Sequence, residues 1–239
     1  MKKTTHFKHT QSIKSIEIDN TYVIGDVHGC FYTLKALMAK LPTDANIIFV
    51  GDLVDKGNFS KEVVEFVMDG NYQCILGNHE VLMIENIEEV LIDKQENAYS
   101  IKKYYGGYKT IHSYESDLLI LKKHITWMKT LPQFIEIDQY FITHGFALPY
   151  YKRRNLKSSY RALMSNRPCD VEEWGHDWEE NFAHYDIINI YGHEPVKEID
   201  TTNNDICIDT GVFTGHKLSA IALKSKTIIS VSTDKRDII

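Results

Sequence analysis

Polar side chains that could bind divalent metals follow short apolar runs at several places in the chain. In chain order these groups are Asp26 with His28, Asp52 with Asp55, Asn78 with His79 and Glu80, then His144, then His193. Mn²⁺, Fe²⁺ and Zn²⁺ accept such mixtures of carboxylate, imidazole and amide ligands. Each group alone is weak evidence, since a Gly-Asp is usually a turn and a single histidine is usually structural or exposed. Their ordered recurrence predicts a convergent metal site.

The number of possible ligands is enough for two ions. Two aspartates, one asparagine and three histidines could hold two ions that share one carboxylate. In two-metal sites the ions lie roughly 3.5–4 Å apart and stabilise the attacking and leaving oxygens of a displaced phosphoryl group. Two dications with two ligating aspartates keep a positive charge, which matches a phosphate dianion. The predicted chemistry is therefore phosphoryl transfer.

The apolar runs before these groups predict the elements that must position them. They have strand length, are rich in β-branched and aromatic residues, and end at turn residues. They cover 22–24, 47–50, 74–76, 140–143, 187–191 and 206–208. Helical periodicity covers 31–41 and 60–68, with Ser60 as the expected N-cap. The chain therefore opens as βαβαβ with parallel strands, whose carboxyl ends share one edge of the sheet.

The remaining patterns predict helices and a final hairpin. Residues 80–92 and 118–130 have helical patterns, 104–107 is a loop, and 217–223 with 227–232 predict the hairpin. Residues 150–186 are polar and aromatic, which is typical of a cap or insertion on the substrate side of a site. Because no repeat or linker interrupts the pattern, we expect residues 1–239 to form a single domain.

Composition excludes several other classes. The chain has 239 residues, a formal net charge of −6 and 43% hydrophobic residues, which are ordinary values for a globular protein. An acidic chain is unsuited to nonspecific binding of nucleic acid or anionic membranes. No apolar run reaches the roughly 18 residues of a membrane helix. Four cysteines without a Cys-x-x-Cys pair indicate no zinc ribbon or redox motif. We expect a cytoplasmic protein.

The motifs together resemble the calcineurin-like metallophosphoesterase superfamily. They are Gly25-Asp-Val-His-Gly29, Gly51-Asp-Leu-Val-Asp-Lys-Gly57, Gly77-Asn-His-Glu80, His144 and Gly192-His193. The narrower resemblance is to its PPP branch of bacterial and phage Ser/Thr phosphatases and symmetrical dinucleoside tetraphosphatases. It extends to Thr110 and to Ile208-Asp-Thr-Gly211, and covers about 22–223. The resemblance implies an α/β fold, a four-layer α/β/β/α sandwich of two mixed sheets flanked by helices.

The resemblance also implies roles for the site residues. The expected ligands of the first metal are Asp26, His28 and Asp52, and Asp52 would bridge to a second metal held by Asn78, His144 and His193. The resemblance implies two divalent ions, with Mn²⁺ favoured over Fe or Zn. A hydroxide bound to both metals would attack phosphorus directly. His79 would protonate the leaving oxygen, and Asp55 would orient it, since a neighbouring carboxylate favours protonated imidazole.

One position departs from the family pattern. Lys56 stands where the family usually has an arginine that clamps the phosphate, and lysine lacks the planar two-donor fork. Another arginine could supply the fork, and the candidates after His144 are Arg153, Arg154, Arg161 and Arg167. Arg167 is the choice, because its Met-Ser-Asn-Arg setting is most similar to the family's segment.

The resemblance leaves the substrate open. A phosphoprotein of Ser/Thr or dual specificity competes with a dinucleoside polyphosphate and with small phosphate esters. No long basic or aromatic tract for nucleotides is evident, and the short chain resembles the small bacterial phosphatases, so a protein phosphatase is favoured. A catalytically impaired metal-binding module is a further alternative. A dinucleotide-binding oxidoreductase is excluded, because the loop at 25–30 lacks the three-glycine fingerprint.

Overall fold

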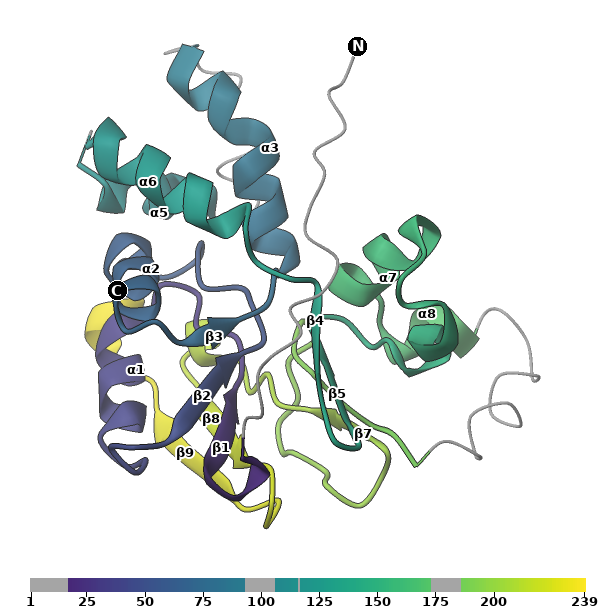
Figure 1. The fold of residues 1–239 in the computed structure, drawn as a ribbon. Helices are drawn as coiled ribbons and strands as arrows, with labels where there is room; N and C mark the ends of the chain where they lie inside the picture. The colour runs from purple at the N-terminus through teal and green to yellow at the C-terminus, as the bar shows by residue number, and fades with distance from the viewer. Residues whose placement is uncertain (1–16, 93–105, 116, 173–185) are drawn as a thin grey trace.

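The computed structural model describes residues 17–92, 106–115, 117–172 and 186–239. Within these residues the strands form two mixed sheets (Figure 1). The five-stranded sheet has the order β3 (Gln73–Cys74), β2 (Asn46–Phe49), β1 (Thr21–Ile24), β8 (Lys217–Ala222) and β9 (Ile228–Ser232). The four-stranded sheet has the order β4 (Phe134–Ile137), β5 (Tyr140–Thr143), β6 (Ile188–Tyr191) and β7 (Asp205–Cys207). The four-layer α/β fold implied by the resemblance is confirmed.

The predicted βαβαβ opening is also confirmed. Strands β1, β2 and β3 are parallel, with helices α1 (Phe31–Met38) and α2 (Ser60–Asp69) as the crossovers. The predicted final hairpin is formed by β8 and β9, and its strand β8 pairs antiparallel with β1. In the second sheet, β5, β6 and β7 are parallel and β4 is antiparallel to β5. Strand β4 was not predicted.

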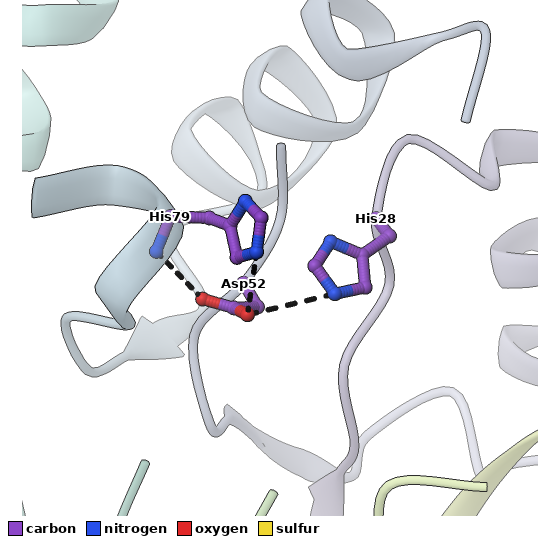
Figure 2. A group of neighbouring side chains, drawn as sticks. All are labelled: His28, Asp52 and His79. Carbon is purple, nitrogen blue, oxygen red and sulfur yellow. Dashed lines mark hydrogen bonds and ion pairs between the residues drawn. The ribbon is translucent and has the colours of Figure 1, made fainter. Parts of the chain in front are cut away.

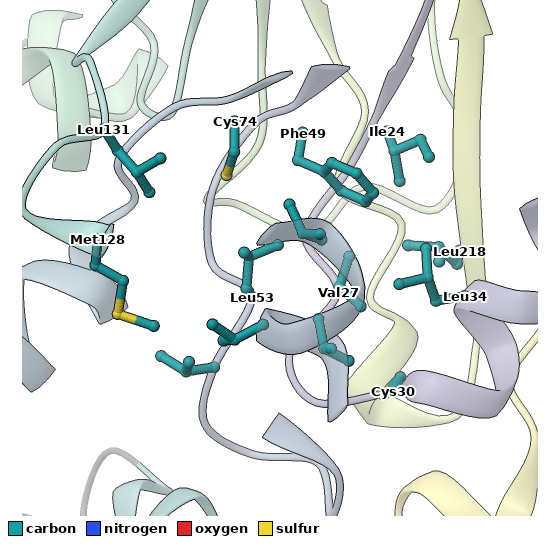
Figure 3. Close-up of a cluster of buried hydrophobic side chains, with 14 of the residues drawn as sticks. Ile24, Val27, Cys30, Leu34, Phe49, Leu53, Cys74, Met128, Leu131 and Leu218 are labelled. Atoms are coloured by element: carbon teal, nitrogen blue, oxygen red, sulfur yellow. The ribbon is translucent and has the colours of Figure 1, made fainter. Parts of the chain in front are cut away.

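Both faces of the central strands are buried. Val23 and Ile48 pack between the two sheets, in a cluster with side chains of β5 and β6. Ile24 and Phe49 face the other way, into the helices of the first layer (Figure 3). Each fully buried side chain of this size stabilises the fold by about 1.5–3 kcal/mol. Strands buried on both faces give continuous apolar runs, which is why these runs were visible in the sequence.

The helices cover the outer faces of the sheets. Figure 1 shows α3 (Asn78–Ile92), α5 (Gly107–Ser113) and α6 (Leu118–Met128) grouped beyond the ends of β2 and β3. Beside the second sheet lie the short helices η2 (Leu148–Arg153), η3 (Lys157–Ser159), α7 (Tyr160–Ser165) and α8 (Pro168–Glu172). They make up the described part of the predicted cap at 150–186, of which 173–185 lie outside the described residues. No helix in the described ranges is long and apolar enough to cross a membrane.

Several element boundaries differ from the prediction. Helix α1 ends at Met38 rather than Leu41, and β3 covers only Gln73–Cys74 rather than 74–76. The prediction that Ser60 caps α2 is wrong. Phe59 occupies the cap position, and Ser60 is the first residue of the helix. The Ser60 hydroxyl is instead used by another loop: it accepts the Asp55 N–H at 3.1 Å and lies 3.0 Å from the Thr110 hydroxyl.

Candidate active site

Both sheets deliver polar side chains to the same edge. Because β1, β2 and β3 are parallel, the residues after them meet at their carboxyl ends, and β5 and β6 act likewise in the second sheet. The loops after these five strands carry, in turn, Asp26 with His28, Asp52, Asn78, His144 and His193. The structure therefore brings together all six residues predicted as metal ligands.

Asp52 lies at the centre of this edge and is buried (Figure 2). Its Oδ2 atom is 3.5 Å from His28 Nε2 and 3.8 Å from His79 Nε2. Asp26 approaches the same group, with Oδ2 at 4.0 Å from His28 Nε2. One side of Asp52 therefore faces a carboxylate and two imidazoles.

The other oxygen of Asp52 faces a second group. Asp52 Oδ1 lies 3.2 Å from His144 Nε2. Asn78 Oδ1 lies 2.8 Å from His144 Nε2 and 2.9 Å from His193 Nδ1. Asp52, His144 and His193 thus offer donor atoms within metal-binding range of one another, as do Asp52, His28 and His79. Two ions that share Asp52 fit this arrangement.

The backbone fixes which histidine nitrogen faces the centre. His28 Nδ1 lies 2.8 Å from the Val54 carbonyl oxygen, and His144 Nδ1 lies 2.8 Å from the Val50 carbonyl oxygen. A carbonyl can only accept, so each Nδ1 carries the hydrogen. When the ring is neutral, Nε2 then has a free lone pair for a metal. The donor chemistry of the site therefore fits divalent metals.

The backbone of the site is unusual. Of the nine described non-glycine residues with positive φ, five are predicted site residues: His28 (46°), Asp52 (50°), Asp55 (70°), Lys56 (66°) and His193 (73°). A left-handed conformation costs a non-glycine residue on the order of 1–3 kcal/mol, and such costs concentrate at functional sites. The fold therefore supplies the free energy that aims these side chains at one point.

Glu80 holds the Asp52 loop, a role that its residue type and spacing did not predict. Its buried carboxylate accepts hydrogen bonds from the backbone N–H groups of Asp52 and Leu53, both at 2.8 Å, and of Gly77 at 3.0 Å. Burial, followed by the charge of Asp52, raises the pKa of Glu80 to about 7. Its place beside Asn78-His79 in the sequence was the only signal available.

Glu80→Gln is expected to lower the free energy of unfolding of the metal-free protein by about 2–4 kcal/mol. The reason is that the new amide NH₂ would face backbone N–H groups and cannot accept hydrogen bonds from them. Urea unfolding at pH 8 measures the change. Glu85→Gln, an exposed position on the same helix α3, is the control and should stay within about 0.5 kcal/mol. A loss below 1 kcal/mol at Glu80 would contradict the assigned role.

His79 and Asp55 form the shortest contact between predicted site residues. His79 Nδ1 lies 2.6 Å from Asp55 Oδ2. Asp55 is held in turn by Thr110, whose hydroxyl donates to Asp55 Oδ1 at 2.7 Å. Burial alone would lower the pKa of His79, but the charge of Asp52 and the bond to Asp55 outweigh it, so the pKa is raised. His79 is therefore suited to hold a proton at Nε2, which points toward Asp52.

The three histidines predicted as metal ligands, His28, His144 and His193, differ in their pKa values. Burial acts against the charged form of His144, yet the charges of Asp52 and Asp26 raise its pKa to about 10. Burial lowers the pKa of His28, and burial with the charge of His144 lowers that of His193 to about 4. Of these three, His144 is thus the imidazole that holds a proton at neutral pH without metal, and it must lose that proton to bind a metal.

Metal binding is therefore expected to release about one proton or more at pH 7. Because a ligand pKa of about 10 lies above this pH, affinity should rise with pH by up to about tenfold per unit. Calorimetric titration of the metal-free protein with Mn²⁺, in two buffers of different ionisation enthalpy, counts the protons. A binding heat that does not depend on the buffer would contradict this expectation.

Lys56 reaches the first group of ligands, whereas no direct contact joins the Arg167 side chain to a predicted ligand among the described residues. Lys56 Nζ is 3.3 Å from His28 Nε2 and 4.0 Å from the centroid of the Phe213 ring. The Phe213 ring also meets the His28 ring edge-on, at 5.0 Å between centroids. Arg167 is exposed, and its charge is one of the smaller causes of the lowered pKa of His193, after burial and the charge of His144. Phe213 was missed, although it follows the Asp209-Thr-Gly211 motif.

Of the other candidate arginines, two contact side chains away from the ligands and the third is exposed. Arg154 Nε pairs with Glu136 at 3.0 Å. The guanidinium of Arg153 stacks on the Tyr150 ring at 4.5 Å from its centroid. Arg161 is exposed on α7. The choice of Arg167 as the second phosphate ligand stays a prediction, which its charge at His193 supports.

Comparison with known proteins gives a consistent family. Curated relatives include the bis(5'-nucleosyl)-tetraphosphatase PrpE [asymmetrical] of Bacillus cereus (strain Q1), 25% identical over 87% of this chain and 92% of its own length. A solved putative diadenosine tetraphosphatase has a TM-score of 0.62 at 19% identity, with 90% of this chain and 94% of the other covered. A protein serine/threonine phosphatase from Saccharomyces cerevisiae has a TM-score of 0.58 at 16% identity, with 91% and 81% covered.

The family assignment rests on a match over most of the chain and does not depend on any single group of residues. The model of the calcineurin-like phosphoesterases matches residues 20–220, from the residue before β1 into β8. That range contains every strand end at which the carboxylates and imidazoles gather. The family uses a dinuclear divalent metal site, and the His and Asp groups around Asp52 offer the donors for one. The chain belongs to the calcineurin-like phosphoesterase family.

Proposed function

We propose that this phosphoesterase hydrolyses phosphate esters and anhydrides with His79 as the general acid, and that dinucleoside polyphosphates are its main substrate class. The observation that carries the reaction is the 2.6 Å contact of His79 with Asp55, next to the two ligand groups that share Asp52. A raised pKa at His79 keeps the proton available near neutral pH. The chain thus combines a candidate metal centre with a candidate proton donor.

In this mechanism each side chain has a separate task. Asp26, His28 and Asp52 would hold one divalent ion, and Asp52, Asn78, His144 and His193 would hold the other. When bound, such ions polarise the phosphoryl oxygens and activate water for in-line attack. Asp55 fixes His79 Nδ1, so that Nε2 donates its proton to the leaving oxygen. Lys56 and Arg167 bind the phosphate oxygens.

The named relatives and a basic segment of the chain support dinucleoside polyphosphates as the substrate class. Curated relatives that span nearly the whole chain are named as asymmetrical bis(5'-nucleosyl)-tetraphosphatases, although their identity is only 25%. A protein phosphatase was favoured from the sequence because no long basic or aromatic tract for nucleotides was evident and the chain is short. Residues 152–167 nevertheless contain six Lys and Arg and no Asp or Glu. A Ser/Thr protein phosphatase remains the second candidate, favoured by the structural similarity to the yeast enzyme.

Side-by-side kinetics decide between the two substrates. The enzyme is assayed with Mn²⁺, Fe²⁺ and Zn²⁺ separately on diadenosine tetraphosphate, on a phosphoserine peptide and on p-nitrophenyl phosphate. We expect the highest kcat/KM with Mn²⁺ and diadenosine tetraphosphate, and AMP with ATP as products would indicate asymmetrical cleavage. A higher kcat/KM for the phosphopeptide would favour the second candidate. Metal loading without turnover of any substrate would overturn the proposal.

A further inference from the structure

The basic residues of the chain are concentrated beside the second sheet. Residues 152–167 hold six of the 27 Lys and Arg, although the whole chain has a net charge of −6. The segment forms the end of η2, then η3 and α7. In Figure 1 this helical region lies beside the second sheet, next to β4 and β5. A cluster of cations without interleaved acids in an acidic chain indicates attraction of an anion.

A cavity of about 520 Å³ opens within this segment. We call it the α7 cavity, and its lining includes Arg153, Ser158, Arg161, Ser165, Asn166 and Asp170. Cavities of a few hundred Å³ are typical of small-molecule sites. Guanidinium, hydroxyl and amide groups all donate hydrogen bonds, so the lining suits phosphate oxygens.

Neither lining arginine is neutralised within the described part of the chain. Arg153 and Arg161 form no ion pair with a described carboxylate, whereas their neighbour Arg154 pairs with Glu136. Arg153 is held in place by stacking on the buried Tyr150 ring. Asp170, the carboxylate in the lining, already accepts the Arg167 N–H at 2.8 Å. The cavity therefore presents two arginines that form no ion pair with a described carboxylate, of which Arg153 also hydrogen-bonds the Tyr150 side chain, and one carboxylate that already accepts a backbone N–H.

The wall of the cavity is attached to the loop that carries His144. The Gly145 N–H donates to the Leu163 carbonyl at 2.8 Å, and the Phe146 N–H donates to the Asn166 carbonyl at 2.8 Å. A Cβ on Gly145 would lie 2.7 Å from the Asn166 nitrogen, so the close approach requires glycine. Backbone hydrogen bonds thus attach the wall of the α7 cavity to the loop that carries His144. A ligand anchored in it would be held at a fixed position relative to the centre.

We propose that the α7 cavity is a second anion subsite, in which Arg153 and Arg161 bind substrate phosphates remote from the bond that is cleaved. The inference rests on the proposed function, since only a polyphosphate substrate brings such phosphates. It assigns these arginines a role separate from that of Arg167, which contacts the reacting phosphate. The subsite distinguishes polyphosphates from simple monoesters, because a monoester such as p-nitrophenyl phosphate has nothing to place in it.

Direct binding tests the subsite without catalysis. Metal-free protein, kept in a chelator, is titrated calorimetrically with inorganic tripolyphosphate. The double variant Arg153→Gln/Arg161→Gln is expected to raise the Kd for tripolyphosphate by about tenfold or more. The loss of one hydrogen bond to a charged group is by itself sufficient for a tenfold change. Lys157→Gln is the matched control: it removes an exposed cation of the same segment that does not line the cavity, and Kd should stay within about twofold. Wild-type protein that does not bind, or a double variant that binds as well, would overturn the proposal.

Kinetics separate failure of the subsite from failure of the proposed function. In the double variant, kcat/KM for diadenosine tetraphosphate should fall at least about tenfold further than kcat/KM for p-nitrophenyl phosphate. The single variant Arg161→Gln, at an exposed position, should show part of the effect if the double variant folds poorly. Equal changes for both substrates contradict the subsite and leave the proposed function intact. Arginine-dependent tripolyphosphate binding without any hydrolysis supports the subsite and contradicts the proposed function.

Discussion

Replacing His79 with asparagine is expected to lower kcat by roughly 10²–10⁴-fold, the usual contribution of a general acid. Asparagine keeps the backbone N–H that donates to Asp52 Oδ1 at 3.0 Å, so the ligand loop should hold its conformation and its metal. The imidazole at 2.6 Å from Asp55 is what is lost. Steady-state kinetics with metal analysis of the same preparations measure both quantities.

The dependence on the leaving group tests the role of His79 most sharply. A poor leaving group needs the proton more than p-nitrophenolate does, so the loss in His79→Asn should be larger with phenyl phosphate than with p-nitrophenyl phosphate. Asp55→Asn should show a smaller loss of the same pattern, because it removes the group that orients and charges His79. His112→Asn, at an exposed histidine, is the control. Equal losses across leaving groups would mean that His79 does not donate the proton.

Asp52→Asn is expected to lower the metal affinity by more than about 100-fold and to abolish activity. Supporting groups cost less when they are removed, whereas the shared carboxylate is proposed to bind the metal directly. Its two oxygens face His28 at 3.5 Å and His144 at 3.2 Å, one on each side. Asparagine offers a single weaker oxygen and no charge, so at least one of two ions should be lost. Elemental analysis after dialysis should show one ion or fewer per chain.

The control for Asp52 can match its backbone as well as its charge. Asp138 lies in an exposed turn with φ of 48°, close to the 50° of Asp52. Asparagine tolerates this left-handed region, so Asp138→Asn removes a carboxylate at the same φ without touching the centre. Metal content and kcat/KM should match wild type in this variant. Full metal content in Asp52→Asn would contradict its assignment as a shared ligand.

Much of the first sheet could be read from the sequence. Strands buried on both faces appear as continuous apolar runs, and turn residues end them, so β1, β2 and the final hairpin were predicted to within one or two residues. Strand β4 was missed, because Phe134–Ile137 alternates with Glu136 and follows a proline, which weakens the strand signal. Ser60 was misassigned as a cap, because its competing partner, the Asp55 N–H, is not visible in a helical pattern.

Candidate ligands could be predicted because residue type and order carry the information. An aspartate or histidine directly after a buried strand must lie at a sheet edge, and parallel strands share that edge. Side chains that support the ligands could not be predicted in this way. Glu80 accepts hydrogen bonds from a loop 28 residues earlier, and Asp237 near the C-terminus accepts the Tyr32 and Thr33 N–H groups at the start of α1. Such bonds depend on packing between distant segments.

The sequence by itself determined the chemical inventory of this protein: six candidate metal ligands at strand ends, a neighbouring His79 with Asp55, and an acidic chain. The tertiary structure decided how these groups are used. It turned the two oxygens of Asp52 toward different histidines, forced five site residues into the left-handed region, and placed the α7 cavity beside Gly145. The physical reason is that type and spacing are local properties, whereas side-chain direction and strain are set by contacts between elements far apart in the chain.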